Sequence, residues 1–333
     1  MKAFLFSMVL SLLLITNSFS QDQIEKLEST AKNCAVQLKV VFLATGKVGD
    51  VSLHSSSCDN SKLDEEAIKA GRKIKFDPQM KDGKPITITK TVEYRFYIPD
   101  EKAEAVLKQA IEKLGGEKYL NVKSQIGRGK FSVIQSGAVV SFQSFVDILV
   151  FPDKERTEFK GSAKTIQTNT GETGWIYDGD AEMFKEQDAA QVENFKRGIR
   201  TSLDNLLRGS WRKDGTLTYI GKRPATLGKR NEVVKLVYTD GLTVEFEFSD
   251  EFMPVKALYK RTNSEDEEVK EEDRYAQFIE VNGIKTPFII DRFTNGAPSS
   301  RINYETVEFN KNISDSIFTK PKTAKEAKKD LKL

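Results

Sequence analysis

The stretch from Val233 to Phe309 constrains the fold of this 333-residue chain more than any other segment. Apolar side chains occupy every second position from 234 to 238 and again from 242 to 248, on either side of an Asp240-Gly241 turn. Two Asn-Gly pairs mark further turns downstream. Alternation with a period of two, bounded by such turns, predicts an antiparallel meander with one apolar face. Because that face is rich in aromatic side chains, it must pack against a core, a helix or a ligand.

Length and charge limit the classes of protein that fit. The chain is long enough for two domains with cores of their own. Its 52 Lys and Arg against 49 Asp and Glu leave a net charge of +3, which provides no electrostatic field for nucleic acid. A single histidine, His54, leaves little scope for metal or acid–base chemistry.

The first twenty residues have the layout of a cleaved secretory signal. Lys2 precedes an apolar run from Phe4 to Ile15, and Ser18-Phe19-Ser20 supplies a small-residue cleavage site. The apolar run is short for a membrane-spanning helix, which needs about 20 residues. We therefore expect an exported protein with a polar lead-in at 21–33, and the alternative is an uncleaved anchor.

Residues 34–58 predict a β-hairpin. A two-residue turn at Thr45-Gly46 would pair Leu38 with Leu53 on the apolar face. The same register sets Cys34 opposite Ser57, so a Cys34–Cys58 disulfide requires the strand to end or bulge there. Export to an oxidising compartment favours this bond, and two free buried thiols are the alternative.

A helix and a third strand follow the hairpin. Ser61 and Asp64 have the spacing of a capping box, and apolar residues recur at helical spacing as far as Ile74. After Asp77-Pro78 and a turn at 81–85, apolar side chains occupy even positions of one long strand. They are Ile86, Ile88, Val92, Tyr94, Phe96 and Ile98. The predicted order is strand, strand, helix, strand.

Residues 34–99 resemble the C-terminal domain of TonB energy-transducer proteins. The resemblance is carried by Gly46-Lys47-Val48, Leu63-Asp64-x-x-Ala67, Phe76-x-Pro78, Asp82-Gly83-Lys84-Pro85 and the closing aromatic strand. It implies that the last strand, over residues 84–97, pairs with an extended segment of an envelope protein by β-augmentation. The partner-strand candidates are Ile86, Ile88, Val92, Tyr94 and Phe96, and the alternative is an edge covered by the next domain.

The chain departs from a TonB protein in one important respect. It has nine prolines and no long proline-rich spacer, and the resembling module comes first instead of last. We therefore carry over the docking mode and not energy transduction.

Residues 100–320 predict a second, larger domain. Asp100 is a plausible N-cap for a helix that lines up Val106 to Leu114 and ends at Gly115-Gly116. A second amphipathic helix spans Val192 to Leu206, and about ten strands account for the rest.

This layout resembles the LolA-type lipoprotein-carrier superfamily over residues 101–320. Besides the two helices, the resemblance rests on Trp175-x-Tyr177-Asp178-Gly179, Asn282-Gly283-Ile284-Lys285-x-Pro287 and Ile313-Ser314-Asp315-Ser316-x-Phe318. It implies an α+β protein overall: a small β-β-α-β unit, then an antiparallel, unclosed β-barrel with covering helices. Family carriers hold the acyl chains of lipoproteins on the concave apolar face and have no catalytic residues.

Nine aromatic residues are candidates for the lining of such a cavity. They are Phe131, Phe142, Phe145, Phe159, Trp175, Phe246, Phe248, Tyr259 and Phe288. In a closed sandwich they would form a core, and alternation alone does not separate the two arrangements.

No catalytic or metal-binding motif occurs in the sequence, so we predict no enzyme activity, no metal and no cofactor. The basic residues of the tail, 321–333, are expected to be flexible and solvated; attraction to anionic lipid headgroups is the alternative.

The first functional hypothesis is a non-enzymatic periplasmic transport or binding protein. Its first module would dock on an envelope protein, and its half-barrel would hold an acyl chain of a lipid or lipoprotein. The alternatives are a protein–protein adaptor with a closed barrel and no lipid, or an accessory of TonB-type transmembrane transport.

Overall fold

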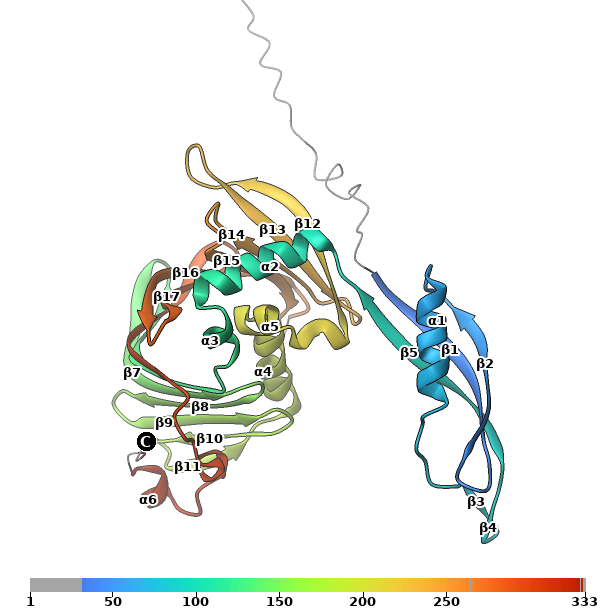
Figure 1. Cartoon of the computed structure of the whole chain (residues 1–333). Helices are drawn as coiled ribbons and strands as arrows, with labels where there is room; N and C mark the ends of the chain where they lie inside the picture. The colour runs from blue at the N-terminus through green and yellow to red at the C-terminus, as the bar shows by residue number, and fades with distance from the viewer. Residues whose placement is uncertain (1–31, 264, 330, 332–333) are drawn as a thin grey trace, which may run out of the picture.

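The computed structural model describes residues 32–263, 265–329 and 331. The expected signal peptide, 1–20, and most of the lead-in lie outside these residues. A small unit ends at Ile98 and a large, curved sheet unit follows it (Figure 1).

The small unit has the predicted β-β-α-β order. Its elements are β1 (Lys32–Phe42), β2 (Val48–Ser56), α1 (Ser61–Gly71), the short pair β3 (Met80–Lys81) and β4 (Lys84–Pro85), and β5 (Ile88–Ile98). The antiparallel sheet has the order β2-β1-β5, and α1 packs on one face of it. A Cβ at Gly71 would lie 3.0 Å from Leu38 Cδ1 and 3.1 Å from Val51 Cγ1, so the glycine lets the end of α1 approach the sheet closely.

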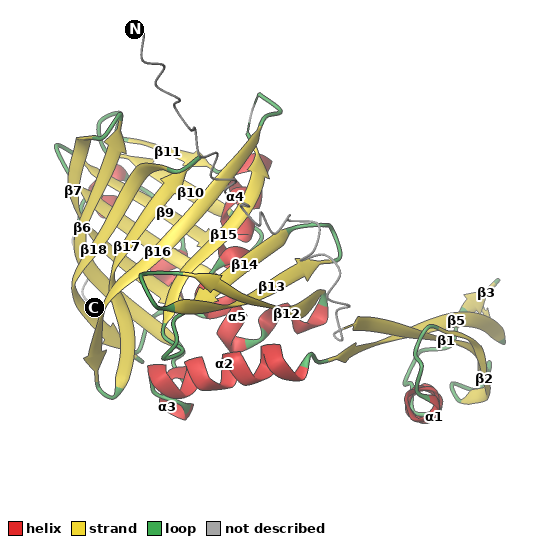
Figure 2. Ribbon diagram, turned by 90° about the horizontal axis from the view of Figure 1, so that it is seen from above, coloured by secondary structure: helices red, strands yellow, loops and turns green. Residues whose placement is uncertain are grey.

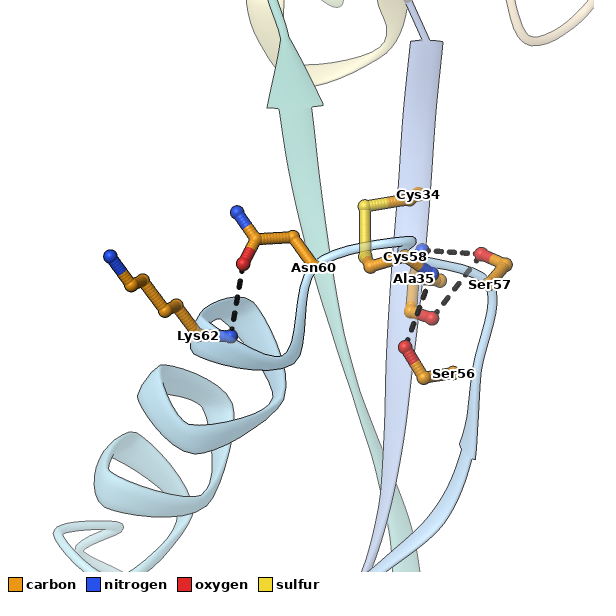
Figure 3. Close-up of a disulfide and its surroundings, with 7 residues drawn as sticks. All are labelled: Cys34, Ala35, Ser56, Ser57, Cys58, Asn60 and Lys62. Carbon is orange, nitrogen blue, oxygen red and sulfur yellow. Dashed lines mark hydrogen bonds between the residues drawn. A yellow bond between two sulfur atoms is a disulfide. The ribbon is translucent and has the colours of Figure 1, made fainter.

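The hairpin register is as predicted in its centre and shifts at both ends. Leu38 pairs with Leu53, but the register shifts between Gln37 and Leu38. This bulge brings Cys34 beside Cys58, and the two form a disulfide with a Cα–Cα distance of 5.0 Å (Figure 3). The turn is one residue longer than predicted, because the Leu43 amide donates to Lys47 O.

The helix and last strand of this unit are shorter than the sequence predicted. The N-cap of α1 is Asn60, whose side chain accepts from the Lys62 amide, so Ser61 is the first helical residue (Figure 3). The apolar periodicity continues to Ile74, but the helix ends at Gly71. Ile86 lies before β5, and its amide donates to Gln79 O.

A two-residue junction leads into the large unit. Asp100 caps α2 (Glu101–Leu114) as predicted, accepting from the amides of Lys102 and Ala103. Gly115 ends this helix with a φ of 125°, a conformation that other residues rarely adopt.

The large unit is built on one thirteen-stranded antiparallel sheet, three strands more than predicted. Its strands are β6 (Ser124–Gln135), β7 (Ala138–Val150), β8 (Lys154–Lys160), β9 (Lys164–Thr170), β10 (Gly174–Asp178), β11 (Met183–Glu186), β12 (Gly215–Pro224), β13 (Arg230–Tyr238), β14 (Thr243–Phe248), β15 (Pro254–Thr262), β16 (Glu268–Val281), β17 (Ile284–Thr294) and β18 (Ala297–Phe309). Pairing of β6 with β18 joins two meanders into the order β11 to β6, then β18 to β12. Among the described residues β11 and β12 are edge strands, so the sheet is unclosed, as predicted (Figure 2).

Helices occupy the inside of the curved sheet (Figure 1). Besides α2, they are α3 (Glu117–Leu120), α4 (Ala189–Thr201), α5 (Leu203–Arg208) and the 3-10 helix η2 (Ser210–Lys213). The single helix predicted over 192–206 is broken at Ser202. The extended backbone of Ser202 ends α4, and the Ser202 hydroxyl accepts from the Asn205 amide to cap α5. The apolar stripe continues through the break, which is why periodicity alone did not reveal it.

The largest core lies between these helices and strands β12 to β15. Leu206 and Trp211 are buried against Leu236 and Phe246, and Tyr97 of β5 packs on Trp211 with ring centroids 5.2 Å apart. The apolar face of the 233–309 meander is therefore covered by helices over this part of its length.

The C-terminal arm covers the opposite face of the sheet. It contains η3 (Asp315–Phe318) and α6 (Ala324–Ala327). Ala327 is buried against Trp175 and Tyr177, and Trp175 Nε1 donates to Phe318 O at 2.8 Å. The expected flexible tail from 321 is thus ordered through α6, because small apolar side chains there cover the aromatic residues of β10.

Candidate ligand-binding cavity

A cavity of about 580 Å³ lies between the concave face of the sheet and the helices. Its walls come from β6 to β8 and β15 to β18 on the sheet side and from α2 to α5 on the helix side. Cavities of 300–1,000 Å³ are typical of small-molecule sites. The cavity is thus large enough to hold a ligand.

One end of the cavity is apolar apart from Asp204 and Arg208, which lie beside Tyr119. Leu114 of α2, Tyr119 of α3 and Ile284 of β17 line it there. These side chains are buried and belong to the main core, so this end is a gap left at the margin of well-packed structure.

Helix α4 forms a lightly packed wall. Its apolar residues Phe195 and Ile199 line the cavity but are only half-buried. Its last turn is tied to the sheet by Arg200, which makes two hydrogen bonds of 2.7 and 2.8 Å to the Asp240 carboxylate. The Arg200 guanidinium holds the pKa of Asp240 down to about 2. Midway along the helix, Lys196 pairs with Glu172.

Two carboxylates meet on the β7–β8 wall. Asp147 and Glu155 both line the cavity, and the Thr157 hydroxyl lies 2.8 Å from Asp147 and 3.2 Å from Glu155. A hydroxyl has one proton to donate, so it satisfies one carboxylate at a time. Burial raises the pKa of both groups, and the charge of Glu155 raises that of Asp147 further.

One positive charge that acts on the two carboxylates is already engaged. Arg292 of β17 lines the cavity, and its charge acts on both carboxylates. Its Nε lies 3.6 Å from Asp273 Oδ1 on the neighbouring strand. Glu271 of the same wall is bound by Arg261 at 2.7 Å. The cavity wall is therefore acidic on the β7–β8 side.

Tyr304 of β18 is fixed in the middle of the sheet wall. A Cβ at Gly127 would lie 2.3 Å from Tyr304 Cε1, so only glycine allows the ring to lie flat on β6. Phe145 and Phe288 pack edge-on against it, with centroids 5.4 and 6.4 Å away. Tyr304 is 9% exposed, and its hydroxyl has no hydrogen-bond partner among the residues that the structure describes.

Of the nine aromatic residues predicted to line a cavity, Tyr259 does so. Phe145 and Phe288 pack behind Tyr304, together with the partly buried Phe131 and Phe159. Neither pair lines the cavity. These four side chains fill a part of the concave face that was predicted to be open.

The remaining four predicted lining residues lie elsewhere. Phe246 and Phe248 are core residues. Trp175 lies under the C-terminal arm, and Phe142 is 64% exposed near the tip of the β6–β7 hairpin. Alternation identified residues that share a face but did not tell which face is concave or which parts of it helices fill.

The strand β5, over which docking was predicted, is an edge strand of the small unit. Within the described residues β5 pairs with β1 alone. Ile88, Val92, Tyr94 and Phe96 pack toward the core under α1, and Ile86 lies just outside the strand. Their side chains support the strand from one face and leave its outer main chain open.

One known protein family matches the small unit. Residues 25–98 match the family model described as Gram-negative bacterial TonB protein C-terminal. The small unit is similar to a TonB C-terminal domain. This confirms the resemblance seen in the sequence, and the Cys34–Cys58 disulfide is consistent with an oxidising compartment. The matched family is not one of enzymes.

Solved structures are similar to the rest of the chain at low identity. A DUF1329 family protein from Desulfovibrio piger shares 12% identity over 66% of this chain and 98% of its own, with a TM-score of 0.48. A LolA superfamily protein from Nitrosomonas europaea shares 15% over 66% and 97%, with a TM-score of 0.45. A putative outer membrane lipoprotein-sorting protein domain from Vibrio parahaemolyticus shares 10% over 65% and 97%, also at 0.45. No curated protein matches the chain.

Sequence reasoning missed the polar wall. Asp147 and Glu155 are eight residues apart on two strands and belong to no motif. The hairpin register pairs Asp147 with Thr157 and Leu149 with Glu155, and a predicted β7–β8 hairpin could have brought the two carboxylates together.

In the described part of the chain no helix is long and apolar enough to span a membrane.

Proposed function

We propose that this is a non-enzymatic protein of the cell envelope that carries the acyl chain of a lipid or lipoprotein in its half-barrel. The cavity of about 580 Å³ carries the proposal, because one end of it is lined by apolar side chains of α2, α3 and β17. Each methylene transferred there from water gains about 0.8 kcal/mol. A wall made by the lightly packed α4 gives a route for entry without opening the main core.

The small unit would dock on an envelope partner through the outer edge of β5. That edge is open in the described chain, and its exposed residues Thr89, Thr91 and Glu93 alternate with those facing the core. An extended segment of the partner would add a strand there through main-chain hydrogen bonds. On this view the small unit sets the location and the half-barrel holds the cargo, in a periplasm reached through the predicted signal.

The cargo proposal is tested on protein purified from the envelope fraction. We expect co-purified lipid in solvent extracts by mass spectrometry, and delipidated protein should bind a fluorescent acyl probe. Protein that carries no lipid and also fails to bind the probe would contradict the proposal.

The docking proposal is tested by placing a photo-crosslinker at each position from 89 to 95 in cells. A strand added to β5 should give crosslinks to one partner with a period of two. The matched control is His54 of β2, an exposed position on the other edge of the same sheet. Equal crosslinking at His54, or no periodicity along β5, would argue against strand addition.

A further inference from the structure

Three acceptor groups converge on one wall of the cavity. Asp147 pairs across the sheet with Gly127, and the Tyr304 ring lies on that glycine. Residues directly opposite on neighbouring strands have Cβ atoms about 5 Å apart. The Tyr304 ring therefore lies beside the Asp147 carboxylate, and Glu155 reaches the same wall through Thr157.

The two carboxylates share one hydroxyl donor, Thr157. Asp147 is 9% exposed, and no cation forms a salt bridge with it or with Glu155 among the described residues. The Tyr304 residue is nine-tenths buried, and its hydroxyl has no hydrogen-bond partner in that part of the chain. Buried polar groups are normally hydrogen-bonded, and buried charges are normally paired. Two carboxylates without a paired cation, beside an unpartnered hydroxyl, point to a ligand that brings a positive charge and several donors.

These oxygen atoms suit an ammonium group better than a metal ion. Calcium takes six to eight oxygen ligands, and the described residues contain no group of three or more Asp, Glu, His or Cys side chains placed to hold a metal. A protonated primary amine has three N–H donors. The two carboxylates and the Tyr304 oxygen supply three acceptors.

We propose that the cavity takes an amphiphile that carries a protonated amine, with its ammonium group between Asp147, Glu155 and Tyr304 and its chain at the apolar end. This inference rests on the proposed function, since it presumes that the cavity holds an alkyl chain. It adds the chemical identity of the ligand's polar group, a protonated amine. In this arrangement Arg292 stays paired with Asp273, and the acidic part of the wall ends there.

The test compares decylamine, decanol and decanoate on the delipidated full-length protein by calorimetry at pH 7. An alkylamine is protonated there, because its pKa resembles that of lysine, about 10.4. Hydrogen bonds to charged groups predict at least about tenfold tighter binding of decylamine than of decanol, with decanoate weakest. Asp147→Asn combined with Glu155→Gln should remove this preference and leave decanol binding unchanged. Tyr304→Phe should lower the preference several-fold.

The matched control is Glu308→Gln with Glu268→Gln, which removes one half-buried and one exposed carboxylate outside the cavity wall. It changes net charge equally and should keep the preference for decylamine. Equal binding of decylamine and decanol by wild type, or a preference that survives Asp147→Asn with Glu155→Gln, would overturn the inference while the acyl-binding function stands. If none of the three compounds binds, both proposals fail.

Discussion

Gly198 of α4 offers a way to fill the cavity without damaging the fold. It lines the cavity, and a Cβ built on it meets no atom within 4 Å. Glycine in a helix interior costs about 1 kcal/mol relative to alanine. Gly198→Leu should therefore raise the free energy of unfolding slightly while its side chain occupies space needed by a ligand.

The expected loss of affinity follows from the displaced chain. A leucine side chain takes the place of roughly three to four methylenes, each worth about 0.8 kcal/mol. Binding of an alkyl or acyl probe should weaken by about 2–3 kcal/mol, on the order of 30- to 150-fold. Probe titration measures the affinity, and thermal unfolding measures stability on the same sample.

Gly198→Ala is the control for the helix itself. It should give a similar gain in stability, with affinity reduced by no more than about fourfold, the value of one methylene. A Gly198→Leu protein that is folded and binds the probe as tightly as wild type would show that the chain does not lie against α4. The reasoning about the cavity wall would then be wrong.

Further predictions concern the elements that hold the cavity and the small unit in shape. Replacing Cys34 and Cys58 together by serine should lower the free energy of unfolding of the small unit by about 3 kcal/mol, since the bond closes a loop between residues 24 apart; denaturant titration checks this, and reductant should have no effect on the variant. Leu236→Ala, in the core beneath the helices, should cost about 2–5 kcal/mol, whereas Phe142→Ala on the exposed hairpin should stay within about 0.5 kcal/mol. Ser202→Ala removes the cap between α4 and α5 and should cost about 1 kcal/mol by the same assay. The Arg200–Asp240 bond depends on pH in a defined direction: the folded pKa of Asp240, about 2, is below the usual value near 3.9, so its stabilisation is complete above about pH 4 and is lost as pH falls through 2. Because the Asp240 side chain is more than half exposed, the loss should not exceed about 1 kcal/mol, and Asp240→Asn should remove it.

The sequence determined the features that depend on neighbouring residues. Asp100 before an amphipathic run and Gly115 after it defined α2, because capping and the positive φ are local requirements. Alternation predicted the pairing of Leu38 with Leu53, although the register shifts on either side of the centre and Leu53 is 46% exposed. Local alternation also predicted an antiparallel sheet, although the number of strands was underestimated; that the sheet is unclosed was implied by the resemblance to the LolA-type superfamily.

Only the tertiary structure decided which surfaces meet. The bulge beside Gln37 brings Cys34 to Cys58, and Ser202 interrupts a helix whose apolar stripe runs on without a break. Trp175 alternates as a lining residue would, yet the C-terminal arm covers its side of the sheet. Asp147 and the Tyr304 ring both lie next to Gly127, because β6 lies between β7 and β18 and carries a glycine there. A strand pattern shows which side chains share a face, whereas the curvature of the sheet and the elements packed on it determine whether that face is core, cavity or surface.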